Sequence, residues 1–192
     1  MTPGRGPILL SLARASIASA FDLSSVEIPD LEWLRVPGAS FVTLREGGEL
    51  RGCVGSVEAR RPLGEDVIHA ARAAAFDDLR FERLERRELD RLHIDVAVLS
   101  PLAELPVASE EEAIRRLVPR RDGVVLSWGP MRALFLPKVW EMLPDPEEFL
   151  ANLKEKAGLT RRFWAPTLRV QIFRTEEFSE DDSRAPRDEH AP

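Results

Sequence analysis

The sequence predicts an α+β protein in which two similar ββαβ units share one mainly antiparallel sheet covered by helices. Three observations lead to this prediction. Short alternating strands come in pairs joined by turns that contain glycine. Each pair leads into an amphipathic helix whose start carries proline or acidic residues. This order occurs twice, over residues 42–76 and 124–158, and a further alternating strand follows each helix.

Composition is that of a globular protein and argues against several functional classes. The 192 residues suit one domain or two intimate subdomains, and the net charge of −6 argues against a general nucleic-acid binder. No apolar run approaches the ~20 residues of a membrane span. The single cysteine excludes an internal disulfide, and the three histidines lack metal-ligand spacing. We expect no metal, no cofactor, no membrane segment and, without a signal-peptide pattern, a cytoplasmic location.

In the first half, short signals mark each element. Leu9, Leu12 and Ile17 form one apolar helical face. Gly47-Gly48 supplies the positive φ of a tight hairpin turn, and Glu65-Asp66 places carboxylates in a first helical turn. The expected elements are a helix over 7–20, an irregular segment over 22–37, strands over 40–44 and 49–57, an alanine-rich helix over 62–76, a charged connector over 82–92 and a strand over 93–99.

In the second half, helix caps are the clearest signals. Ser109 precedes three glutamates and caps a short helix. Asp145 and Pro146 read as an N-cap and a first helical residue, and Gly158 ends that helix. The expected elements are a helix over 109–117, strands over 124–127 and 131–136, a helix over 145–158 and a strand over 168–173.

The two halves also align at their most distinctive points. Leu50-Arg51 matches Met131-Arg132, and Glu65-Asp66 matches Glu147-Glu148. We interpret this as an internal duplication; the alternative is that ββα is a common local pattern. The expected organisation is a single domain over 1–178 with interlocked repeats over about 40–99 and 122–173, and a disordered polar tail over 179–192.

The most unusual strand is the one that contains the only cysteine, which stands between two glycines. Glycine weakens a strand interior, so Gly52 and Gly55 indicate a bend or the close approach of a ligand or a second backbone. Alternation divides this strand into two faces. The apolar face would carry Leu50, Gly52 and Val54. The other face would carry Arg51, Cys53 and Gly55.

The run Leu50-Arg51-Gly52-Cys53-Val54-Gly55 resembles the Leu-Arg-Gly-Cys-Ile-Gly signature of the AMMECR-type domain family, also called protein A of the AmmeMemoRadiSam system. The resemblance extends from about Pro7 to Phe178. Two positions depart from the family pattern, because Val54 replaces isoleucine and Leu79 stands where proline is common. Further matching segments are Arg61-Pro62-Leu63, Glu65-Asp66-Val67, Ala73-Ala74-Ala75-Phe76, Arg80-Phe81, Val98-Leu99-Ser100-Pro101, Arg132–Pro137, Val139-Trp140 and Lys156–Leu159.

The resemblance implies a duplicated α+β fold with a barrel-like sheet. It also implies that the protein occurs alongside a Memo-like protein and a radical-SAM protein in many bacteria and archaea. It supplies no established reaction. Any chemistry must therefore be argued from the residues themselves.

Cys53 is the candidate catalytic residue. Arg51 lies ~7 Å away along the same strand face, and a guanidinium beside a thiol favours the thiolate. The alternative is a structural thiol, because free cysteine usually packs as a small hydrophobe. His93 with Asp95 would complete a Cys-His-Asp arrangement if their strand lay beside Cys53; otherwise His93 is a strand-edge residue.

Arg51 and Arg132 form a second candidate feature, since the repeat places them at equivalent strand positions. Two guanidinium groups opening on one concavity would bind phosphate or carboxylate. The alternative is that each pairs with a local acid such as Glu49 or Asp77. Arg80 has the same two interpretations. The predicted substrate-binding residues are Arg51, Gly52, Gly55, Arg80 and Arg132, and the predicted ligand is an anionic small molecule.

Three functional hypotheses follow from these features. The first is an enzyme or a component of an enzyme system, with a ligand cleft around Arg51, Cys53 and Gly55. The second is a non-catalytic adaptor whose cleft binds a peptide or a partner protein. The third is an RNA-binding sheet, which the acidic net charge argues against.

Overall fold

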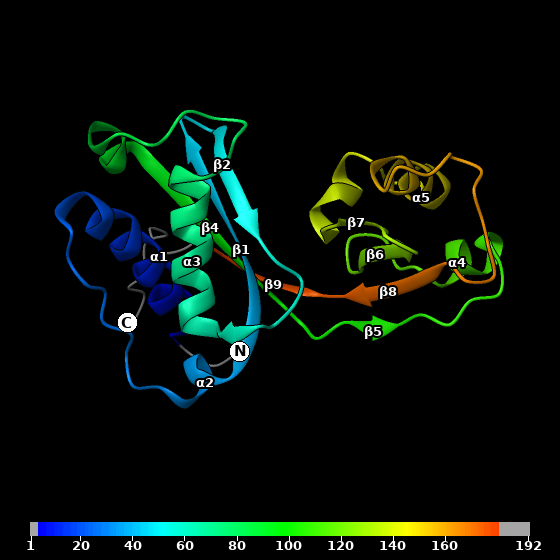
Figure 1. Ribbon diagram of the computed structural model, residues 1–192, viewed down its shortest axis with the longest axis horizontal. Coiled ribbons are helices and arrows are strands. Elements are labelled where there is room, and N and C mark those ends of the chain that lie inside the picture. The colour runs from blue at the N-terminus through cyan, green and yellow to red at the C-terminus, as the bar shows by residue number, and fades with distance from the viewer. Residues whose placement is uncertain (1–3, 181–192) are drawn as a thin grey trace, which may run out of the picture. The chain divides into compact units, whose positions relative to one another are not determined.

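The computed structural model describes residues 4–180, in which helices and antiparallel strands combine as expected for an α+β fold (Figure 1). The strands fall in two sheets, of five and four strands. The chain divides in the same way into two compact units, which within the described residues are unit 1 (4–99 with 176–180) and unit 2 (100–175). The α+β prediction is confirmed. The prediction of one shared, barrel-like sheet was wrong, because the described strands form two sheets and neither closes.

Unit 1 has a five-stranded sheet with helices on one face. Its order is β2-β1-β4-β9, with β3 beside β1. Helices α1 and α3 pack on the same face of this sheet (Figure 1). We call the opposite face of the sheet the far face. It carries Thr43, Cys53 and Asp95. The elements are α1 (Arg5–Asp22), α2 (Glu32–Arg35), β1 (Pro37–Glu46), β2 (Glu49–Gly55), β3 (Arg61–Pro62), α3 (Leu63–Phe76), the 3-10 helix η1 (Arg86–Arg91), β4 (Leu92–Leu99) and β9 (Thr175–Ser179).

Unit 2 has an antiparallel four-stranded sheet in the order β5-β8-β6-β7. Its two predicted caps are confirmed, since the Ser109 and Asp145 side chains accept backbone N–H groups of Glu112 and Glu148. The elements are β5 (Ala103–Glu104), α4 (Glu110–Arg116), β6 (Gly123–Trp128), β7 (Met131–Phe135), the 3-10 helix η2 (Pro137–Glu141), α5 (Pro146–Lys156) and β8 (Arg169–Phe173).

The two units repeat one topology. In unit 1 the hairpin β1–β2 is followed by α3 and then by β4, which pairs with β1. In unit 2 the hairpin β6–β7 is followed by α5 and then by β8, which pairs with β6. The sequence predicted this order of elements in both halves. That a duplication produced it stays a prediction.

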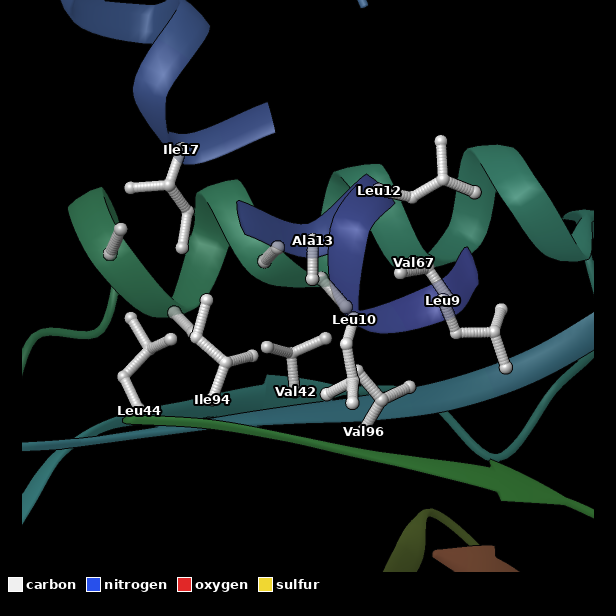
Figure 2. Close-up of a cluster of buried hydrophobic side chains, with 14 of the residues drawn as sticks. Leu9, Leu10, Leu12, Ala13, Ile17, Val42, Leu44, Val67, Ile94 and Val96 are labelled. Carbon is white, nitrogen blue, oxygen red and sulfur yellow. The ribbon is translucent and has the colours of Figure 1, made fainter. Parts of the chain in front are cut away.

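The core of unit 1 lies between its sheet and the two long helices (Figure 2). Val42 and Leu44 of β1 and Ile94 of β4 point from the sheet toward the two helices and are completely buried. Helix α3 covers β1 and helix α1 packs on β4, and α1 adds residues such as Leu9 and Ile17 to the same cluster. Because side chains alternate along a strand, this packing turns Thr43 and Asp95 to the far face. The alternating pattern read from the sequence therefore sets which groups occupy each face.

A β-bulge at Arg51 corrects the predicted faces of β2. Leu44 pairs with Gly52 but Arg45 pairs with Leu50, so Arg51 is an extra residue in β2. The extra residue reverses the alternation, and Leu50 leaves the buried face and is exposed. Gly52 keeps its predicted place on the helix-covered face.

Three short strands were not predicted. β3 and β5 contain two residues each, too few to show an alternating pattern. β9 extends to Ser179, and Glu180 accepts hydrogen bonds from Arg14 at 2.6 and 2.7 Å, so the predicted tail does not begin at 179. The rest of that predicted tail, 181–192, lies outside the described residues. Across residues 4–180, no helix has the length and apolar character needed to cross a membrane.

Candidate functional site

Cys53 lies in the middle of β2, a strand at the edge of the unit 1 sheet. Its register partner is Thr43, whose Oγ1 lies 3.3 Å from the Cys53 Sγ. The thiol is partly exposed. The exposure of the thiol therefore lies between those expected from the two interpretations of the sequence, a thiol buried in the core and an accessible nucleophile.

Asp78 and Arg80 hold the backbone of Cys53 from outside the sheet. The Asp78 Oδ2 accepts the Cys53 N–H at 2.9 Å, and the Arg80 Nη2 donates to the Cys53 carbonyl oxygen at 3.2 Å. The same guanidinium also bonds both Asp78 carboxylate oxygens, at 2.7 and 2.9 Å. Asp78 is nearly buried, whereas the Arg80 side chain is 58% exposed. Arg80 thus reaches the predicted site, but it is already engaged with a carboxylate.

These contacts shift the acid–base behaviour of both partners. The hydrogen bond from Arg80 is the main reason that the pKa of Asp78 is held well below its usual range, with a further contribution from the Cys53 N–H. The same bond raises the pKa of Arg80. The pair therefore stays ionised at neutral pH and cannot serve as a proton donor or acceptor there.

Arg51 is bound to the connector that follows α3. Its Nε and Nη2 donate to the two carboxylate oxygens of Glu88 at 2.8 and 3.2 Å, and its Nη1 donates to the Glu82 carbonyl at 2.8 Å. Both side chains of the ion pair are largely buried. The bond to Glu88 raises the pKa of Arg51 and lowers that of Glu88. The local-acid alternative thus holds for Arg51, although the acid is neither Glu49 nor Asp77.

A polar pocket of about 480 Å³ opens beside this ion pair. We call it the arginine pocket. Arg83 forms no ion pair with any residue of the described chain, whereas Arg87 pairs with Glu85 and Arg91 pairs with Glu46. The lining residues are Arg51, Phe81, Glu82, Arg83, Glu85, Arg87, Glu88 and Arg91. Of the predicted site residues, only Arg51 lines it.

Close backbone packing accounts for the two glycines. A Cβ on Gly52 would lie 2.1 Å from the Ala74 carbonyl oxygen of α3, and a Cβ on Gly55 would lie 2.2 Å from the Ser40 carbonyl oxygen. Both distances are far below van der Waals contact. Of the alternatives raised by the sequence, the approach of a second backbone is the one observed.

His93 and Asp95 share the far face with Cys53 but do not form a triad with it. Thr43 of β1 stands between Cys53 and Asp95, so their strands are separated by ~10 Å. The His93 Nε2 lies 2.8 Å from the Ser179 Oγ and 3.3 Å from the Asp95 Oδ1. Because both contacts fall on one ring nitrogen, this group also lacks the arrangement of a Ser-His-Asp triad.

Arg132 lies apart from the other predicted residues, on β7 of unit 2 opposite Ser127, and is exposed. The premise that Arg51 and Arg132 share one sheet was wrong, since β2 and β7 belong to different sheets. The shared anion cleft of these two arginines stays a prediction without that support. Among the described residues, no group of His, Cys, Asp and Glu side chains gathers as a metal site would require.

Sequence reasoning missed Asp78, Glu88 and Arg83. Asp78 stands two residues before Arg80, a spacing that carries little information by itself. Glu88 lies in a connector with alternating charges, where any of several acids could have faced Arg51. One indirect signal was available in the sequence. An arginine in the middle of a strand needs a hydrogen-bonding partner from outside that strand, but the sequence does not say which residue it is.

Fold and site together define a class of protein. It is an α+β protein with two antiparallel ββαβ units, a partly exposed cysteine held by an Asp–Arg pair, and a charged pocket beside the Arg51–Glu88 ion pair. The AMMECR1 family model matches residues 10–178 of the chain. The chain belongs to the AMMECR1 family, as its resemblance to that signature predicted.

Relatives of known sequence and structure agree with this assignment. A protein of Methanothermobacter thermautotrophicus is 37% identical over 181 residues, which cover 92% of this chain and 94% of the relative. A protein of Thermofilum pendens is 36% identical over 194 residues, which cover 91% of this chain and 89% of the relative. The crystal structure of the uncharacterized protein PH0010 from Pyrococcus horikoshii matches with a TM-score of 0.83 and 34% identity, over 91% of this chain and 90% of that one.

Proposed function

We propose that this protein is the ligand-binding component of a multi-protein enzyme system and that it binds an anionic small molecule in the arginine pocket. One observation carries the proposal: four arginines and an aromatic ring line a pocket of about 480 Å³ beside the Leu50–Gly55 run. That volume suits a small-molecule ligand. Guanidinium groups are the preferred donors to carboxylate and phosphate.

The charges in the pocket favour Arg83 as the ligand's main contact. Glu88 pairs with Arg51 and Glu85 pairs with Arg87, whereas Glu82 forms no ion pair among the described residues. Arg83 also remains without an ion pair among the described residues; its guanidinium lies over the Phe76 ring, 5.6 Å from the ring centroid, and its backbone carbonyl accepts a hydrogen bond from Arg51. A second pocket of about 510 Å³ beside α1 is a poorer candidate, because its lining includes Asp22 and Glu27 but no basic residue.

Binding of small anions tests the proposal. Pyrophosphate and citrate are suitable probes, measured by isothermal titration calorimetry and thermal shift at constant ionic strength. We expect Arg83→Ala to lose most of the binding. Arg60→Ala is the matched control, since Arg60 is an exposed arginine paired with Glu58 that does not line the pocket. Equal binding by both variants, or none by the wild type, would refute the proposal.

The system in which the ligand acts is proposed from the family resemblance alone. Its other members would be a Memo-like protein and a radical-SAM protein, in the cytoplasm. Co-purification of the tagged chain with those two proteins, with and without Arg83→Ala, tests both the partnership and its dependence on the pocket.

An adaptor is the second candidate function, and one observation favours it. Leu79 is 99% exposed between Asp78 and Arg80, next to Phe81 of the arginine pocket. An apolar side chain exposed on a hydrogen-bonded turn suits contact with a partner protein. Leu79→Ser should weaken partner capture without changing anion binding if this alternative holds. The RNA-binding hypothesis gains no support from a pocket of mixed charge.

A further inference from the structure

Strand β2 is an edge strand whose outward hydrogen-bonding groups are occupied at its centre. In an antiparallel pair, every second residue turns its N–H and C=O away from the partner strand. Cys53 is such a residue. Asp78 accepts its N–H and Arg80 donates to its carbonyl, so one Asp–Arg pair takes both groups that a further strand would use.

The sheet of unit 2 has the same feature at the corresponding place. Strand β7 is also an edge strand, and the Lys156 Nζ donates to the Leu134 carbonyl oxygen at 3.0 Å. Leu134 follows Met131 at the same distance as Cys53 follows Leu50, and these two are equivalent in the repeat. In each unit the donor comes from the end of the helix that follows the hairpin, since Arg80 lies just beyond α3 and Lys156 ends α5.

A contribution to folding stability is a weak explanation for the hydrogen bonds that Arg80 and Lys156 donate to the edge strands. Arg80 and Lys156 are exposed, and a hydrogen bond or ion pair of an exposed cation contributes little to folding. The strands themselves supply a stronger reason. β7 reads Met131-Arg132-Ala133-Leu134-Phe135, an apolar segment with a single charge, and such a segment on a free edge favours pairing with another strand.

Each cation also lies over an aromatic ring, which belongs to the β7 edge for Lys156 and to the loop after α3 for Arg80. Lys156 lies over the Phe135 ring, 5.1 Å from its centroid, and Arg80 lies over the Phe81 ring at 5.4 Å. A strand arriving at either edge would have to displace a charge as well as a hydrogen bond. This is the chemistry by which proteins block sheet extension.

We propose that Asp78, Arg80 and Lys156 prevent further strands from pairing with the β2 and β7 edges. The partner that they exclude is the strand edge of a second copy of this chain. Both cations bind a carbonyl inside the strand, that of Cys53 in β2 and that of Leu134 in β7. From there a single side chain interrupts pairing in both directions along the edge.

Sedimentation velocity of Arg80→Ala, Lys156→Ala and the double variant tests the proposal, over a wide range of protein concentration and in reducing buffer. We expect the weight-average sedimentation coefficient of the double variant to rise with concentration beyond that of the wild type. Lys156→Arg should behave as the wild type because it keeps a donor. Arg161→Ala, which removes the two ion pairs of Arg161 with Glu148 and Glu155 of α5, is the matched control.

Hydrogen exchange locates the contact. In the associated double variant, amides of β2 or β7 should gain protection as concentration rises. A folded double variant that sediments as the wild type overturns the proposal, and so does association with new protection elsewhere only. If the double variant does not fold, the single Lys156→Ala variant decides, because it removes only an exposed side chain.

Discussion

The Asp78 carboxylate accepts the backbone N–H of Cys53 at 2.9 Å, across 25 residues of sequence. The contact joins the loop after α3 to the centre of the edge strand β2. The backbone of the Leu50–Gly55 run is therefore held by Asp78, a residue that no local sequence pattern pointed to.

Asp78→Ala should destabilise unit 1. The change leaves the part-buried Cys53 N–H without its charged acceptor, and hydrogen bonds to charged groups contribute about 1.5–3 kcal/mol. Urea unfolding followed by circular dichroism measures the loss. Asp77→Ala is the matched control, because Asp77 is exposed and adjacent. Equal effects of the two substitutions would contradict the role assigned to Asp78.

Stability should fall with acid in a way that depends on Asp78 and Glu88. The pKa of each is lower in the folded protein than in the unfolded chain, so the stabilisation is complete at neutral pH. It is lost as pH falls below the unfolded values of about 4 and through the folded ones. The advantage of wild type over Asp78→Asn in urea unfolding should therefore shrink between neutral pH and about pH 3. A gap independent of pH would contradict this account.

Gly52→Ala should destabilise the protein strongly. The new Cβ would meet the Ala74 carbonyl at 2.1 Å, and a backbone atom of α3 cannot rotate away. Overpacking of this kind costs typically about 1–3 kcal/mol. Gly47→Asn is the matched control, since Gly47 has open space and a φ of 60° that asparagine tolerates. Wild-type stability of Gly52→Ala in thermal unfolding would show that α3 lies further from β2.

Cys53 should react with iodoacetamide in the folded protein, because its side chain is partly exposed. Mass spectrometry of the labelled protein over time, with and without denaturant, measures this. Cys53→Ser should keep the fold and the anion binding if the thiol is not part of the arginine pocket. Labelling seen only after unfolding would instead assign Cys53 to packing. Loss of partner-system activity in Cys53→Ser with intact binding would assign it to catalysis.

Local patterns predicted most of the secondary structure because local interactions produce it. The Ser109 and Asp145 caps, the positive φ of Gly47 and the alternation of β4 each depend on residues a few positions apart. The bulge at Arg51 could not be predicted this way. A bulge is an extra residue relative to a partner strand, and it appears only when the two strands are set in register.

The partners of individual side chains could not be predicted from local patterns, as Asp66 illustrates. The sequence places it in the first turn of a helix, where a carboxylate favours the dipole. In the structure it is buried, accepts the N–H and hydroxyl of Ser40 in β1, and has a pKa raised by that burial. Whether such a carboxylate faces water or the core depends on how α3 packs on β1.

The sequence by itself determined the family, the order of the elements and the strand that carries Cys53, because these follow from short-range patterns. Only the tertiary structure decided that Arg51 pairs with Glu88, 37 residues away, and that the glycines serve backbone packing. It also decided that two sheets form where one was expected. The physical reason is common to all three. Several acids, strands and helices in this chain are chemically able to make each contact, and only the packed geometry selects among them.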